Sequence, residues 1–180
     1  MTQVENPTKV ATKWAVIYAL TAIVITYIFQ FANIPQDSPA KWLGYIPFIA
    51  FLLLAQKEYK DHLGGYLTFG QGFSAGFRYA LFGGLIMAVF LFVYLKFLSP
   101  EIIAKSLDDQ RDKMANEQHL SPEQIDKAIE IGTKYGAIIG AFVAAVGSAV
   151  FGAIIALIGA AIFKKERSAF DSEDYTEPTV

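Results

Sequence analysis

The residues of this sequence that could carry out chemistry are few and far apart. It has two histidines, His62 and His119, each within a polar stretch, and no cysteine. Without a thiol, disulfide bonds, thiolate metal sites and thiol catalysis are excluded, and a lone exposed histidine is usually a solvated side chain. The clusters of His, Asp and Cys that intramembrane enzymes use are also missing. We therefore predict that the protein is not an enzyme and has no catalytic, cofactor-binding or metal-binding residues.

Charged and aromatic side chains at the ends of apolar stretches indicate a membrane boundary instead. Arg78 and Lys96 each lie near the end of such a stretch, where a long side chain can extend its charge to water. Trp14 and Trp42 begin two stretches, and an indole ring is favoured where lipid meets water. We predict that these four residues lie at the membrane interface. The net charge of −2 gives no basic field for nucleic acid, which is therefore not an expected partner.

The elements that must position these residues are transmembrane helices. The chain of 180 residues is 54% hydrophobic, and its apolar residues are concentrated in four blocks. Backbone groups inside a bilayer must be paired within their own segment, and these blocks lack the alternation of barrel strands. The sequence therefore predicts an all-α integral membrane protein with four transmembrane helices, at about residues 14–34, 41–57, 77–98 and 136–163.

Three segments are open to another interpretation. The first block follows two lysines as a signal peptide does, but it is long enough to span a bilayer, and we interpret it as an uncleaved helix. The second block is short and includes Pro47, which predicts a kink; a re-entrant segment is the alternative for this block. The stretch FGQGFSAGF at 69–77 has the aromatic and glycine pattern of a re-entry into the membrane, and it is not a phosphate-binding loop.

The distribution of lysine and arginine predicts the orientation. Residues 1–13 carry two lysines, and residues 164–180 begin with a basic cluster. Positively charged ends stay in the cytoplasm, so we expect both termini there and a multi-pass protein of the bacterial inner membrane. Basic residues in the loop between the third and fourth blocks weaken this assignment. We expect 1–13 to be a cytoplasmic tail and the acidic segment 164–180 to be disordered.

The loop between the third and fourth blocks, residues 99–134, has the pattern of an extramembrane helical hairpin. Ser99-Pro100-Glu101 combines a capping serine, a proline at the first helical position and an acid at the positive helix end. Ser121 and Gln124 form a capping box for a second helix, which can continue into the fourth block. The apolar stripes of the two helices are Ile103, Leu107 and Met114, and Ile125, Ala128, Ile129 and Gly132. They can pack on each other, lie on the membrane surface or bind a partner.

The fourth block separates its side chains by size. The small row, at every fourth position, is Gly136, Gly140, Ala144, Ser148, Gly152, Ala156 and Ala160, and the large row is Ile138, Phe142, Val146, Val150, Ile154, Ile158 and Ile162. Small residues let helix backbones approach closely in a bilayer. We predict that the small row packs against other helices and that the large row faces lipid or fills grooves. Because such a row winds around the helix, its two ends should contact different helices, in the same chain or in another.

The order of these motifs resembles a known family. The stretch YLTFGQGFSAGF, a hydrophobic helix that ends in YLKFLSPEII, the stretch LSPEQIDKAIE and a last apolar helix are similar to the bacterial membrane proteins of domain-of-unknown-function family 4199. The resemblance covers about residues 10–165. It implies a four-helix inner-membrane protein with a helical insert before the last helix. The family has no assigned activity, so the resemblance implies no functional residue.

Two classes of function fit these observations. The first is a non-enzymatic integral membrane protein whose partners are the lipid bilayer and either a second copy of itself, as a homo-oligomer, or another membrane protein. The alternative is a small transporter or channel. A water-filled cavity lined by Gln30, Asn33, Arg78 or Ser148 would favour the alternative, whereas a solid bundle with an apolar patch on the hairpin would favour the first.

Overall fold

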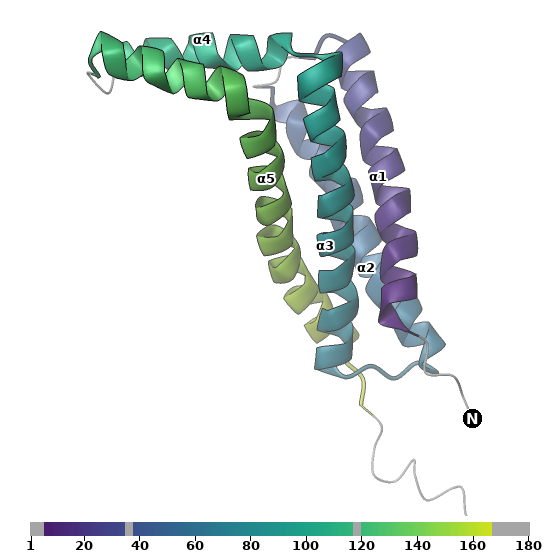
Figure 1. The fold of residues 1–180 in the computed structure, drawn as a ribbon. Helices are drawn as coiled ribbons and strands as arrows, with labels where there is room; N and C mark the ends of the chain where they lie inside the picture. The colour runs from purple at the N-terminus through teal and green to yellow at the C-terminus, as the bar shows by residue number, and fades with distance from the viewer. Residues whose placement is uncertain (1–5, 35–37, 117–119, 167–180) are drawn as a thin grey trace, which may run out of the picture. The chain divides into compact units, whose positions relative to one another are not determined.

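The computed structural model describes residues 6–34, 38–116 and 120–166, and this part of the chain is all-α, as predicted (Figure 1). Its five α-helices are α1 (Pro7–Phe31), α2 (Tyr45–His62), α3 (Phe69–Val93), α4 (Glu101–Asn116) and α5 (Pro122–Phe163). A 3-10 helix, η1 (Pro39–Gly44), precedes α2, and a π-helical segment, η2 (Tyr94–Leu98), extends α3. These ranges contain no strand, but Leu67 and Lys165 form an isolated antiparallel bridge.

Three helices in the described part of the chain are long and apolar enough to cross a membrane. They are α1, α3 together with η2 (Phe69–Leu98), and α5, and the first, third and fourth predicted spans fall on them. Their length and composition indicate a multi-pass membrane protein. The second predicted span, 41–57, falls largely on α2. This helix is not one of the three, because its last two turns carry polar and charged residues. These are Gln56, Lys57, Glu58, Lys60, Asp61 and His62.

The chain divides into two compact units, and each is described separately. Unit 1 consists of residues 1–83 and 149–180, and unit 2 consists of residues 84–148. The helices α3 and α5 each contribute one part to unit 1 and one part to unit 2.

The core of unit 1 is built around α2. Phe48, Leu52 and Ala55 are almost fully buried on this helix. The hydroxyl of Tyr79, on α3, donates a hydrogen bond of 3.0 Å to the Phe48 carbonyl oxygen. The Tyr18 ring, on α1, meets the Phe48 ring edge-on with centroids 5.2 Å apart. The remaining core positions are mostly alanines, which let the helices approach closely: Ala11, Ala15, Ala75, Ala80 and Ala156.

The predicted kink at Pro47 is wrong, because the helix begins later than the apolar block. The helix α2 starts at Tyr45, so Pro47 is its third residue. The first backbone N–H groups of a helix have no partner within it. A proline there removes no hydrogen bond, and the segment before it takes up the 3-10 conformation of η1.

The predicted re-entry at 69–77 is also wrong, because these residues are already helical. They form the first turns of α3, whose glycines bring α3 close to α5 within unit 1. A methyl group added at Gly72 would lie 3.2 Å from the Ala160 Cα, and one at Gly76 would lie 2.9 Å from the Ala156 Cβ. The glycines in this stretch therefore serve helix packing.

The first helix starts seven residues before the predicted span. The Asn6 side chain accepts a hydrogen bond of 3.0 Å from the Thr8 backbone N–H, and Pro7 occupies the first turn. This is a standard N-cap followed by a proline. Seven residues of the expected cytoplasmic tail, 7–13, are therefore the first turns of α1.

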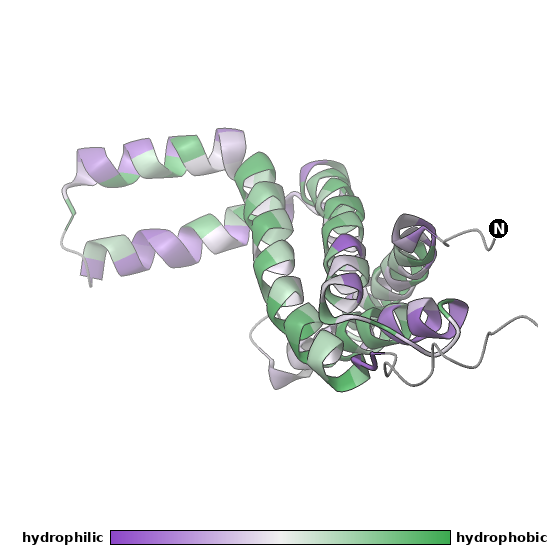
Figure 2. Ribbon diagram, turned by 90° about the horizontal axis from the view of Figure 1, so that it is seen from below, coloured by the Kyte–Doolittle hydropathy of each residue, from purple (hydrophilic) through white to green (hydrophobic). Residues whose placement is uncertain are grey.

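In unit 2, α5 continues from the polar loop into the apolar block without interruption, as the sequence predicted. Its capping box is confirmed, since Ser121 N–H donates to Gln124 Oε1 (2.9 Å) and Gln124 N–H is 3.4 Å from Ser121 Oγ. The two apolar stripes of the hairpin face each other. A methyl group at Gly132 would lie 2.4 Å from a Leu107 methyl, and one at Gly136 would lie 3.4 Å from the Ile103 side chain. Figure 2 shows hydrophilic residues along α4 and the first turns of α5, and hydrophobic ones along the rest of α5.

Candidate functional site

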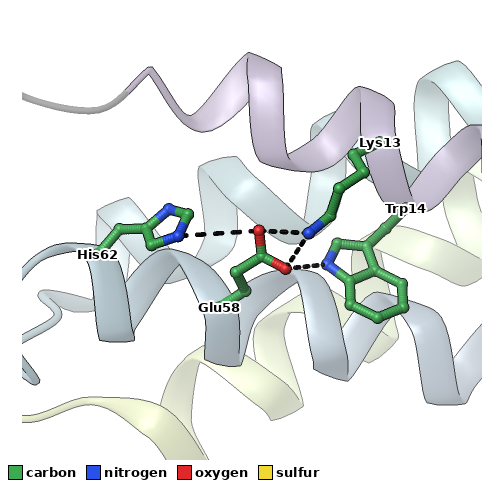
Figure 3. Close-up of polar contacts among 4 residues, drawn as sticks. All are labelled: Lys13, Trp14, Glu58 and His62. Atoms are coloured by element: carbon green, nitrogen blue, oxygen red, sulfur yellow. Dashed lines mark hydrogen bonds and ion pairs between the residues drawn. The ribbon is translucent and has the colours of Figure 1, made fainter.

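A charged and aromatic cluster joins the start of α1 to the end of α2 in unit 1 (Figure 3). Glu58 accepts hydrogen bonds from the ammonium of Lys13 at both carboxylate oxygens, the one to Oε1 at 2.6 Å. The indole N–H of Trp14 donates to Glu58 Oε2 at 2.9 Å. His62 lies one turn after Glu58, with its Nε2 3.8 Å from Oε1. A single carboxylate of α2 therefore binds two side chains of α1, and His62 adds a contact within α2 itself.

The electrostatics of this cluster favour a charged Glu58. Partial burial, the largest single influence, raises the pKa of Glu58. The hydrogen bonds from Lys13 and Trp14 and the charges of Lys13 and His62 together outweigh burial and lower the pKa below its ordinary value. A carboxylate stabilised by several donors is a weak general base. The arrangement therefore serves as a clasp between helices and is poorly suited to proton transfer.

Only part of the signal for this cluster is present in the sequence. Glu58 and His62 have the four-residue spacing of neighbours on one helix face, and Lys13 and Trp14 are adjacent. The sequence pattern places Trp14 at the membrane interface and does not single out Glu58. The pairing depends on the antiparallel arrangement of α1 and α2, which no spacing within one helix can reveal.

A second polar contact that the sequence did not predict lies in the core of unit 1. The Gln56 side chain is fully buried, and its Nε2 donates to the carbonyl oxygens of Gly72 (2.9 Å) and Ala156 (2.8 Å). One amide thus links α2 to α3 and α5. The Oε1 atom has no hydrogen-bond donor within the described residues and lies against the backbone of Gly159, where a methyl group would approach it to 1.9 Å.

The small row of α5 runs through both units. In unit 1, Gly152, Ala156 and Ala160 are buried, and a methyl group at Gly152 would lie 2.1 Å from the Ala80 Cβ. In unit 2, Gly136 packs near Ile103 of α4, whereas a methyl group at Gly140 would be 3.7 Å from Leu95 of η2.

The two remaining members of the small row, also in unit 2, differ from each other. Ala144 is exposed. Ser148 donates to the Ala145 carbonyl oxygen at 2.9 Å and lies against Gly84 of α3. Along its length, the small row therefore meets α4, η2, α3 and, at Gly152, also Phe48 of α2.

The large row of α5 faces outward along its whole length. All seven of its residues are exposed, from 47% at Val146 to 68% at Phe142. The two rows therefore differ in environment as well as in size. Gly147, which is next to the large row, has nothing within 4 Å of the position of an added methyl group.

The four predicted interface residues occupy different environments. Trp14 stacks on Phe51 with ring centroids 5.6 Å apart, in addition to its bond to Glu58. Trp42 is 64% exposed. Arg78 donates to Thr8 Oγ1 at 2.7 Å. Lys96 is exposed, with its Nζ 5.3 Å from the centre of the Phe92 ring.

The polar residues that could line a transport path are dispersed. Gln30 and Asn33 are exposed at one end of α1, whereas Arg78 is bound to Thr8 at the other end. Within the described residues no group of three or more His, Cys, Asp or Glu side chains could hold a metal ion. His119 and residues 167–180, which make up most of the predicted C-terminal tail, lie outside the described residues.

Comparison with known proteins adds a family and no activity. Residues 13–165 match the family described as "Protein of unknown function (DUF4199)", which is the family that the sequence motifs resemble. Comparison with curated proteins and with solved structures gives no match. The matched range includes the whole of α2, α3, α4 and α5 and most of α1. The chain therefore belongs to the DUF4199 family.

Proposed function

We propose that the protein is a non-enzymatic component of the bacterial inner membrane that spans it four times and associates there with a membrane protein or with a second copy of itself. The observation that carries this proposal is the outward-facing large row of α5, exposed from Ile138 to Ile162. A continuous apolar surface of this kind must be covered by lipid or by another protein.

The packing of α2 supports a fourth span. In unit 1, α2 contacts α1, α3 and α5, which are the three helices with the composition of membrane spans. At about 1.5 Å per residue, its 18 residues extend about 27 Å, close to the hydrocarbon thickness of about 30 Å. A core helix among three spanning helices must cross the same layer, and its charged last turns would then lie at the boundary.

The charge distribution within unit 1 supports cytoplasmic termini. The start of α1, the end of α2 and the end of α5 lie at the same end of this unit, and they carry six lysines. These are Lys9, Lys13, Lys57, Lys60, Lys164 and Lys165. The connection from α1 to α2 at the other end includes only Lys41. Under the positive-inside rule the lysine-rich end is cytoplasmic.

Association is favoured over transport by the placement of the polar residues. A polar path needs several such side chains on one side of one cavity. Gln30 and Arg78 are instead at opposite ends of α1, and the buried Gln56 uses its donors within the core. The interior of unit 1 is filled with apolar side chains.

Photocrosslinking in cells tests the association. A benzophenone amino acid in place of Phe142, on the large row, should form a covalent adduct with another protein chain. The same replacement at Tyr79, which is fully buried, should react only within its own chain. Reaction of the Phe142 probe with lipid alone would contradict the proposed association.

A further inference from the structure

A groove in unit 2 combines an apolar wall with two lysines. It has a volume of about 240 Å³ and lies where η2, α4 and α5 meet. Phe92, Leu95 and Ile138 line it on the side of the apolar helices, and Ile103 and Leu107 of α4 cover it. Lys96 and Lys134 belong to the same lining, which contains no acidic residue. An apolar surface beside positive charge is the environment that an anionic amphiphile requires.

The two lysines mark the same boundary on two helices. Lys96 lies two residues before the end of the apolar segment Phe69–Leu98. Lys134 comes directly before the uncharged segment that runs from Tyr135 to Phe163. The groove therefore includes the last apolar turn of one helix, the first apolar turn of the other and the charged residues at both ends. In a bilayer this is the level of the lipid headgroups.

Neither lysine is neutralised within the described part of the chain. The nearby Arg111 forms an ion pair with Asp126, but no ion pair involves Lys96 or Lys134. Their ammonium groups lie against aromatic rings instead, at 5.3 Å from the centres of Phe92 and Tyr135. A cation beside a ring keeps its charge available to a further, anionic partner.

We propose that this groove binds an anionic phospholipid, with its phosphate at Lys96 and Lys134. The groove is smaller than the roughly 300 to 1,000 Å³ of sites that enclose a whole ligand. It would hold the headgroup and the first carbons, and the acyl chains would continue along the exposed side chain of Ile138. The proposal rests on the membrane insertion in the proposed function, but not on the number of spans or their orientation.

Lipid titration of the full-length protein in a non-ionic detergent tests the site. Native mass spectrometry would count bound dioctanoyl phosphatidylglycerol and, as the zwitterionic comparison, dioctanoyl phosphatidylcholine. We expect the anionic lipid to bind more tightly. A Lys or Arg near an anionic surface contributes about 1 kcal/mol, so Lys96→Gln and Lys134→Gln should each weaken its binding about fivefold, and the arginine variants should retain it.

Matched variants on the same hairpin provide the controls. Lys105→Gln and Lys127→Gln remove exposed lysines that do not line the groove and should leave binding unchanged. Ala104→Phe fills the groove without changing charge and should weaken binding, whereas Ala115→Phe, also exposed on α4, should not. If a glutamine variant loses its helical circular dichroism, this alanine pair decides the question.

Several outcomes would overturn the site. Equal affinity for the two lipids would show that the charge of the headgroup has no role. If the glutamine variants of the control lysines weakened lipid binding as much as those of the groove lysines, the lipid would be attracted to the hairpin in general. Displacement of the lipid by millimolar inorganic phosphate would identify a site for free anions. Equal binding by Ala104→Phe and Ala115→Phe would place the lipid elsewhere. Failure of the crosslinking at Phe142 would leave this proposal standing, since the two experiments measure different contacts.

Discussion

At the scale of single residues, two polar side chains connect the helices of unit 1. Glu58 joins α2 to α1 near the end of the helices, and Gln56 joins α2 to α3 and α5 in the core. They differ in environment, since Glu58 is half-buried and Gln56 is inaccessible. Their substitutions should therefore have different consequences.

Replacement of Gln56 should depend strongly on the charge of the new side chain. Gln56→Leu loses two interhelical hydrogen bonds, each worth about 0.6 kcal/mol on average in a membrane protein, but it also removes an unpaired oxygen. We expect a loss of about 1 kcal/mol or less. Gln56→Glu places an ionisable group among apolar side chains and should destabilise the fold far more.

The destabilisation by Gln56→Glu should be smaller at pH 5 than at pH 8, because a protonated carboxyl can still donate a hydrogen bond. Thermal unfolding in detergent at both pH values measures this difference. The exposed Gln110→Glu on α4 is the control and should change stability little at either pH. Similar unfolding of Gln56→Leu and Gln56→Glu at pH 8 would show that the site is not a closed interior.

Glu58 should contribute a pH-dependent part of the stability. Its pKa is lower in the folded protein than in the unfolded chain, so its contribution is present above the unfolded pKa and is lost as pH falls through the folded pKa. Glu58→Gln should remove this loss from the acid side of the stability profile. Since ion pairs of this exposure contribute about 1 kcal/mol or less, the effect at neutral pH should be small.

Unfolding midpoints of the Glu58→Gln variant between pH 3 and pH 7 provide the measurement. Asp61→Asn, at the next exposed position of the same helix end, is the comparison. An identical acid profile for Glu58→Gln and the unaltered protein would exclude the clasp.

At the scale of elements, α5 shows how side-chain size determines packing. Its small positions in unit 1 lie against α2 and α3, and its large positions face outward. The surroundings of the α5 glycines are not uniform along the helix. Gly152 has no room for another atom, Gly140 has an ordinary distance to its neighbour, and Gly147 faces open space.

Leucine substitutions at the glycines of α5 should follow these distances. Gly152→Leu should cost about 1 to 3 kcal/mol or more through overpacking, because Ala80 is a small residue that cannot move aside. Gly147→Leu should be neutral or stabilising by up to about 1 kcal/mol, since leucine favours the helix more than glycine does. Gly140→Leu should fall between them, because the nearest neighbour of an added methyl group there, Leu95, lies at an ordinary contact distance of 3.7 Å.

The fraction that remains folded in detergent over a temperature series orders these variants. Val150→Leu, on the outward row, adds no branched group to a contact and should be neutral. Equal tolerance at Gly152 and Gly147 would mean that the size pattern reflects composition and not packing.

At the scale of the whole molecule, the proposed topology makes a prediction for each side of the membrane. A reporter that is active only in the periplasm should be inactive when fused after Lys165 and active when inserted after Asn116, since the lysine-rich end of unit 1 is assigned to the cytoplasm. Activity at the first position and inactivity at the second would reverse the orientation. The same state at both positions would mean that α5, the candidate span between them, does not cross the membrane completely.

Much of the architecture followed from local pattern. The all-α class, the uninterrupted α5, the capping box at Ser121 and the apolar stripe on each helix of the hairpin each depend on neighbours within one or two turns. Helical periodicity and capping are local properties, so the sequence alone can reveal them. The N-cap at Asn6 and Pro7 is equally local, but the predicted span began at Trp14 because the apolar block begins there.

Only the tertiary structure decided which residues meet. The glycines at 69–77 resembled a re-entrant loop until their contacts with Ala156 and Ala160 showed that they serve packing. The sequence showed that α5 is sorted by size, but it could not show that the small row contacts α4 at one end and α2 and α3 at the other. Glu58, Gln56 and the lysines of the groove acquire their surroundings from helices distant in sequence. Such contacts depend on how helices pack in three dimensions, and the period within a single helix carries no record of its neighbours.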